Sequence, residues 1–109
     1  MIRRTGGNKY GAIPTTADGI RFPSKRESLR YLTLKILLKG GKIADLELQP
    51  TYPIMINGNH ICLVKLDFRY RDLDTGKTII EDSKGQDTPV SKIKRKLVQA
   101  QYGIEVVLV

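Results

Sequence analysis

The sequence predicts a single α/β domain with a mixed central sheet, in the order helix, three strands, helix, strand. Three observations support this prediction. Two segments show helical spacing of apolar residues between a capping residue and a glycine. The β-prone segments between them are separated by tight-turn signals, which predicts antiparallel neighbours. The last apolar segment follows the second helix, and such a crossover lets it run parallel to a neighbouring strand.

Chain length and composition fit one globular domain. With 109 residues the chain can build one modest core, so we expect an N-terminal arm and hairpin (1–23) ahead of the core (24–109). No apolar run reaches the roughly 18 residues of a membrane span, and the start lacks a secretory signal. We therefore expect no membrane partner and a cytoplasmic location. One cysteine excludes an intrachain disulfide and a zinc site made of cysteines.

The first half of the core is expected to begin with a hairpin and a helix. Asp18-Gly19 is a tight-turn signal, which predicts a small hairpin over residues 12–22. Ser24 and Glu27 fit a capping box, and the helix over 24–39 is followed by two glycines that end it.

The remaining elements follow from turn and cap signals. Residues 46–50 are expected to form a connection. Three strands are expected at residues 51–56, 61–70 and 77–84, the first at a sheet edge because it contains Pro53. Thr88 and Pro89 begin a second helix that ends at Gly103, ahead of a last strand at 104–109. One face of that helix is predicted to carry Val90, Ile93, Leu97 and Ala100.

Acidic residues gather in one part of this basic chain: six of eleven lie between Asp67 and Asp87. If the turn after the second strand is centred on Asp74-Thr75, Arg71 lies opposite Thr78. The same register places Asp67 opposite Asp82, and Lys65 opposite Lys84. Opposed residues share one face of a sheet, so Asp67, Asp82 and Lys84 would converge. Two opposed carboxylates repel, and a divalent cation such as Mg²⁺ or Mn²⁺ removes that penalty.

Other arrangements of these acids stay open. Asp82 could instead pair with Lys84 or Arg69 in a surface ion network, and a one-residue slip would bring Glu81 opposite Asp67. Glu27 could close the capping box with Ser24. It also shares a helical face with three apolar side chains, and a carboxylate turned inward there needs a partner, which a metal would supply.

Glu27 on a first helix, then Asp67, then Asp82-Ser83-Lys84 resembles the PD-(D/E)XK nuclease superfamily, whose core has the order helix, three strands, helix, strand. More narrowly, the chain resembles a family of small phage and prophage proteins within it. That closer likeness lies in Asn8-Lys9-Tyr10, Asp18-Gly19-Ile20-Arg21-Phe22, Ser24-Lys25-Arg26-Glu27, Leu46-Glu47-Leu48-Gln49-Pro50, Asp67-Phe68, Glu81-Asp82-Ser83-Lys84-Gly85 and Tyr102-Gly103-Ile104-Glu105. The usual proline before the first aspartate is Leu66 here, which leaves the ligands unchanged.

The resemblance implies a restriction-endonuclease-like core and a metal-dependent DNA endonuclease. Asp67 and Asp82 would ligate Mg²⁺ or Mn²⁺ together with the backbone carbonyl of Ser83, and Glu27 would hold a water of the metal or a second ion. Lys84 would orient the attacking water and offset charge on the phosphate. Gln49 is a secondary candidate near that water, although a strand-end amide can equally satisfy backbone groups.

The implied partner is DNA, and the implied subclass is a Holliday junction resolvase. Similar small members of the superfamily cut four-way junctions as homodimers, which suggests branched DNA as the substrate and phage recombination or replication as the setting. For a phage-encoded protein, the location would be the cytoplasm of the host cell.

The charge of the chain points independently to a polyanion. The formal net charge is +8 and the isoelectric point is about 9.8. Both predicted helices carry basic residues with hardly any acid among them, an arrangement that a nucleic acid would neutralise. The candidate DNA-binding residues are Arg3, Arg4, Lys9, Lys25, Arg26, Arg30, Lys92, Lys94, Arg95 and Lys96. The alternative function is a basic nucleic-acid-binding protein without catalysis.

Overall fold

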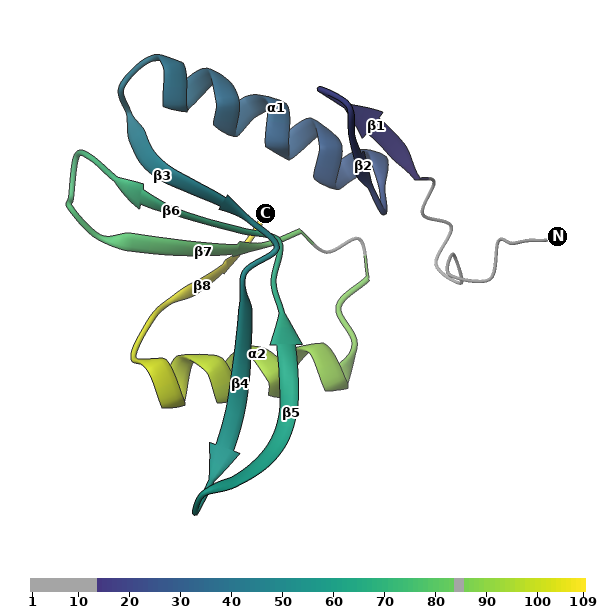
Figure 1. The fold of residues 1–109 in the computed structure, drawn as a ribbon, viewed down its shortest axis with the longest axis vertical. Coiled ribbons are helices and arrows are strands. Elements are labelled where there is room, and N and C mark those ends of the chain that lie inside the picture. The colour runs from purple at the N-terminus through teal and green to yellow at the C-terminus, as the bar shows by residue number, and fades with distance from the viewer. Residues whose placement is uncertain (1–13, 84–85) are drawn as a thin grey trace, which may run out of the picture.

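The computed structural model describes residues 14–83 and 86–109, which form two helices and eight strands of an α/β fold (Figure 1). The helices are α1 (Lys25–Lys39) and α2 (Pro89–Tyr102). The strands are β1 (Thr15–Ala17), β2 (Ile20–Phe22), β3 (Ile43–Leu48), β4 (Thr51–Ile56), β5 (Asn59–Lys65), β6 (Phe68–Asp72), β7 (Thr78–Asp82) and β8 (Val106–Leu108). Neither helix is long and apolar enough to cross a membrane.

A four-stranded mixed sheet forms the centre of the fold, in the order β3-β6-β7-β8. Strands β3, β6 and β7 are antiparallel neighbours, and β8 runs parallel to β7 after the α2 crossover. The elements of this sheet and its helices therefore follow one another as α1, β3, β6, β7, α2, β8. The predicted order of helix, three strands, helix, strand holds only for the central sheet and its helices, because five described strands separate α1 from α2 along the chain. The strand predicted over 77–84 is β7, whereas the other two members of the sheet differ from the prediction.

The first difference is β3, where the sequence predicts a connection. Apolar residues on this strand do not alternate with a strict period of two, because the pairing with β6 shifts between Ala44 and Glu47. Asp45 has a φ of 57° at this bulge. A bulge adds a residue to one strand and breaks the alternation by which strands are recognised in a sequence.

The second difference is that the strand predicted over 61–70 is two strands. Its first half, β5, pairs with β4 in a separate hairpin, and its second half, β6, enters the central sheet. The chain changes partners at Leu66 and Asp67. The Leu66 N–H donates to the carbonyl of Pro50, and the Gln49 N–H donates to the carbonyl of Asp67. The continuous apolar pattern hides this break because both halves bury side chains.

Two apolar clusters hold the layers together. The cluster beneath α1 is made of Phe22, Tyr31, Leu34, Ile43, Phe68 and Tyr70. The cluster beneath α2 is made of Tyr52, Ile54, Val64, Leu66, Ile80 and Val98. In Figure 1 the central sheet lies between the two helices, with the β1–β2 hairpin beside α1 and the β4–β5 hairpin extending past α2. The sheet is therefore buried from both sides.

The helix ends follow the predicted caps. The Ser24 hydroxyl accepts a hydrogen bond from the Glu27 N–H at 3.1 Å, and the Thr88 hydroxyl accepts one from the Ser91 N–H at 3.1 Å. Gly103 ends α2 with a φ of 66°, a left-handed conformation that favours glycine.

The predicted face of α2 is wrong in part. Val90 and Ile93 are exposed, whereas Val98 is completely buried. The inner face of the helix carries Arg95, whose guanidinium is held by Asp87. The apolar residues at the start of α2 therefore face away from the core.

Candidate active site

Three carboxylates from distant parts of the chain meet where β6 begins and β7 ends. Glu27 comes from the first turn of α1, Asp67 immediately precedes β6, and Asp82 is the last residue of β7. Glu27 and Asp82 are each only 4% exposed, and Asp67 is half-buried. Glu27 shares its buried helical face with Tyr31 and Leu34, as the sequence predicts.

The strand register agrees with the predicted one up to the site. Arg71 lies opposite Thr78, and regular pairing ends with Phe68 opposite Glu81. One residue earlier the ladder becomes irregular, because the Asp67 N–H donates to the carbonyl of Glu81 at 3.1 Å. The Asp67 carboxylate accepts a hydrogen bond from the Ser83 N–H at 2.5 Å. That bond ties Asp67 to the chain directly after Asp82.

Glu81 contacts α1, whereas the neighbouring Asp82 lies near Arg95 of α2. Glu81 is 1% exposed and accepts two hydrogen bonds from the Arg30 guanidinium, at 2.7 and 2.6 Å, and one from the Tyr70 hydroxyl at 2.5 Å. Burial, followed by the bond to Glu81, raises the pKa of Tyr70 to about 12. Arg30 therefore neutralises a buried acid of the fold while its side chain stays 29% exposed, and its predicted contact with DNA stays a prediction.

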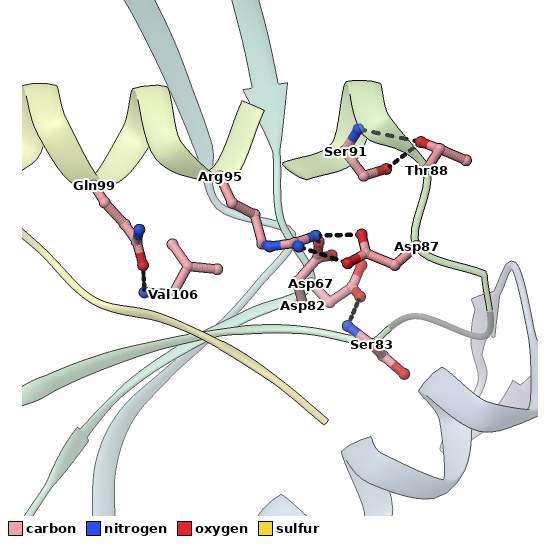
Figure 2. A network of polar contacts seen from close by, with 9 residues as sticks. All are labelled: Asp67, Asp82, Ser83, Asp87, Thr88, Ser91, Arg95, Gln99 and Val106. Atoms are coloured by element: carbon pink, nitrogen blue, oxygen red, sulfur yellow. Dashed lines mark hydrogen bonds and ion pairs between the residues drawn. The ribbon is translucent and has the colours of Figure 1, made fainter. Parts of the chain in front are cut away.

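Arg95 belongs to the site rather than to the exposed face of α2. Its side chain is 12% exposed and donates two hydrogen bonds of 2.8 Å to Asp87, while one guanidinium nitrogen lies 3.8 Å from Asp82. Figure 2 shows the guanidinium between Asp87 on one side and the Asp67 and Asp82 carboxylates on the other. Asp87 is not among the site residues predicted from the sequence, although it directly precedes the Thr88 cap and lies two helical turns from Arg95.

The pKa values of the carboxylates show that this part of the site disfavours negative charge. Burial raises the pKa of Glu27, and the nearby charge of Asp82 raises it further. Hydrogen bonds with Asp67 and Gln49 lower it, but the net shift is upward. Burial and then the charge of Glu27 raise the pKa of Asp67 to about 8, although the Ser83 N–H opposes this shift. Without a cation, Asp67 is thus largely protonated at neutral pH.

The donor set fits a hard divalent cation. Glu27 Oε2 and Ser83 Oγ are buried and make no hydrogen bond to any described residue. Carboxylate and hydroxyl oxygens are ligands that Mg²⁺ and Mn²⁺ accept. Over residues 14–83 and 86–109, however, no three His, Cys, Asp or Glu side chains stand in the arrangement of a metal site. The oxygen atoms gathered here are of the kind that bind a divalent cation, but their positions do not add to that argument.

Gln49 lies beside the carboxylates, as the sequence analysis proposed for this secondary candidate. It has a φ of 51°, its N–H donates to the Asp67 carbonyl at 2.8 Å, and its side chain interacts with Glu27. A left-handed backbone is strained for a residue other than glycine, and such strain is concentrated at functional sites. The Gln49 side chain therefore lies near Glu27, and its predicted role beside a metal-bound water stays a prediction.

The other basic candidates divide into three groups. Lys25, Lys92, Lys94 and Lys96 are exposed and make no ion pair with a described residue. Arg26 is exposed and donates to the carbonyl of Val109 at 3.3 and 3.2 Å. Arg3, Arg4 and Lys9, as well as Lys84 of the predicted site, lie outside the described residues. The lysines of α2 therefore remain the clearest surface for an anion.

The sequence matches, over residues 7–108, a family described as "Protein of unknown function (DUF1064)", so the chain belongs to that family. The match includes Glu27, Asp67 and Asp82 together with every described helix and strand. Searches of curated proteins and of solved structures found no match.

Proposed function

We propose that this member of the DUF1064 family is a metal-dependent DNA endonuclease of the PD-(D/E)XK superfamily. The observation on which the proposal rests is the meeting of Glu27, Asp67 and Asp82 in one largely buried place. Holding acids together there destabilises the protein unless the arrangement serves a purpose, and a binding protein without catalysis has no use for it.

The topology supports the same proposal. The order α1, β3, β6, β7, α2, β8, with three antiparallel strands and a parallel fourth, agrees with the restriction-endonuclease-like core that the sequence resemblance implies. In this core the β4–β5 hairpin is an insertion between the first and second strands of the sheet. In this proposal Asp67 and Asp82 are the two metal-binding acids of the motif.

In this proposal the carboxylates of Glu27, Asp67 and Asp82 and the carbonyl of Ser83 hold Mg²⁺ or Mn²⁺. When bound, such a cation stabilises the negative charge that develops on phosphate oxygens during hydrolysis. Lys84 adds positive charge beside the phosphate. Arg95 acts through Asp82: its guanidinium lies 3.8 Å from that carboxylate and orients it.

The proposed substrate is branched DNA, in particular a four-way junction. The described residues are taken up by the α/β fold and form no separate module that reads sequence, which favours recognition of DNA shape. By analogy with small members of the superfamily, two copies would act as a homodimer and make one cut each.

A second candidate function is binding of nucleic acid without cleavage. It is favoured by Arg95, because a guanidinium 3.8 Å from Asp82 already supplies a positive charge at the site. In that case the acids would be structural partners of Arg95, and the exposed lysines would carry the function.

Cleavage assays separate the two candidates. We would incubate plasmid DNA and a synthetic four-way junction with the protein in Mg²⁺, in Mn²⁺ and in EDTA, and repeat the assay with Asp82→Asn. The matched control is Asp74→Asn, an exposed acid in the turn between β6 and β7. We expect cleavage that disappears in EDTA and in Asp82→Asn but persists in Asp74→Asn, with DNA binding retained throughout. Cleavage by Asp82→Asn would refute the site, and binding without cleavage under every condition would establish the second candidate.

A further inference from the structure

A pocket of about 200 Å³ opens beside the carboxylates, between the end of β5 and the first turns of α2. One wall is formed by residues 63–66, and the other by Ser91, Lys94 and Arg95. Asp82 closes the end of the pocket next to the candidate active site. In Figure 2, Ser91, Arg95 and Asp82 are seen along this side of α2.

The lining of the pocket is strongly positive. It contains three cations, Lys65, Lys94 and Arg95, against one acid, Asp82. Arg95 is engaged with Asp87 and Asp82, whereas Lys65 and Lys94 make no ion pair with any described residue. Two lysines without an ion pair that line one small pocket place like charges near each other, which a bound anion would neutralise.

The size of the pocket suits a phosphate group. A water molecule takes up about 30 Å³ of liquid, so a pocket of about 200 Å³ has room for a group of five heavy atoms together with ordered water. The Ser91 hydroxyl adds a neutral hydrogen-bond donor to the ammonium groups. Exposed Leu63 at the rim offers an apolar surface to the sugar next to such a phosphate.

The position of the pocket connects it to the carboxylates. Asp82 is shared between the two, and the charge of Lys65 acts on Glu27, whose pKa it lowers against the effect of burial. An anion bound between Lys65 and Lys94 would thus lie next to the proposed metal-binding acids. Asp82 repels that anion as long as no cation is present.

We propose that Lys65, Lys94 and Ser91 form a binding subsite for one internal phosphodiester of the DNA backbone. The proposal extends the proposed function, because it assigns the place where the substrate strand is held beside Asp82. Neither Lys65 nor Ser91 is indicated by the sequence, since they lie on separate elements and outside the D-x-K triplet.

Binding measured without a divalent cation tests the subsite apart from catalysis. We would titrate a fluorescent 20-base-pair duplex in EDTA at several salt concentrations with wild type, Lys65→Gln, Lys94→Gln and their double variant. The matched control is Lys96→Gln, an exposed lysine of the same helix that does not line the pocket. Circular dichroism would verify that each variant is folded.

We expect each pocket variant to weaken binding roughly tenfold and to lower the log–log salt slope by about 0.9, as for one phosphate. Lys96→Gln should weaken binding about twofold. Because both lysines hold the same phosphate, the affinity of the double variant for the duplex should fall by far less than the product of the two single-variant factors. Equal affinity for duplexes with a 5′-phosphate and a 5′-hydroxyl end would indicate an internal phosphodiester.

The subsite would be overturned if the pocket variants lost no more affinity than Lys96→Gln, or if the double variant lost the full product of the two single losses. Affinity that depends on a terminal phosphate, or no binding of DNA by the wild type, would also overturn it. If the expected losses occur while no DNA is cut in Mg²⁺, the subsite stands and only the nuclease proposal fails. If Asp82-dependent cleavage occurs while the pocket variants bind DNA like the control, the nuclease proposal stands and the subsite fails.

Discussion

Replacing Asp67 by Asn is expected to stabilise the metal-free protein at neutral pH. The pKa of Asp67 is raised from 3.8 to about 8, first by burial and then by the charge of Glu27. Between these two values the folded protein holds a proton that the unfolded chain releases, so the free energy of unfolding falls as pH rises. Asn is always neutral, and its side-chain oxygen can still accept the hydrogen bond from the Ser83 N–H.

The size of the effect follows from the width of this pH window. A carboxyl group held neutral against solvent lowers stability by up to about 1.4 kcal/mol for each pH unit above its ordinary pKa. Because Glu27 and Asp67 influence each other's protonation, part of this cost is relieved by Glu27. We therefore expect Asp67→Asn to raise the free energy of unfolding by roughly 1–3 kcal/mol at pH 7.5.

Urea unfolding in EDTA at pH 4.5, 6.0 and 7.5 would test this. The gain from Asp67→Asn should be close to zero at pH 4.5 and grow with pH, whereas the exposed control Asp74→Asn should show no trend. Adding Mg²⁺ at pH 7.5 should stabilise wild type and not Asp67→Asn, because a cation bound only to the folded state shifts the equilibrium. A loss of stability that is the same at all three pH values would refute the reasoning and make Asp67 a structural partner of Ser83.

Two further predictions concern stability alone. Arg30→Met should lower the free energy of unfolding by about 3–5 kcal/mol, because it leaves Glu81 buried without a counter-charge, and Arg30→Met with Glu81→Gln should recover part of this loss. Leu34→Ala should lower it by about 2–5 kcal/mol, since Leu34 is 0% exposed, while Ile36→Ala, at 71% exposure, should change it by less than about 0.5 kcal/mol. Urea unfolding measures both pairs, and equal effects of Leu34→Ala and Ile36→Ala would contradict the packing described for α1.

Local chemistry was sufficient for the features that depend on a few neighbouring residues. The caps at Ser24 and Thr88, the left-handed Gly103 and the turn at Asp18-Gly19 are all as the sequence predicts, because each satisfies backbone groups within one turn of the chain. The inward face of Glu27 also follows from helical spacing. The register of Arg71 opposite Thr78 follows from the length of its turn.

Features that depend on distant partners were settled only by the folded chain. The bulge at Asp45 and the change of partner at Leu66 cannot be recognised in the local sequence. The sequence of a bulged strand resembles that of a loop, and two consecutive buried strands have the apolar pattern of a single strand. The basic residues show the same limit: Arg30 and Arg95 look like free surface cations along the chain. Arg30 is held by Glu81, which only tertiary contact brings within reach, because a buried carboxylate needs a positive partner. Arg95 is held by Asp87, and only the folded chain places its guanidinium near Asp82 as well.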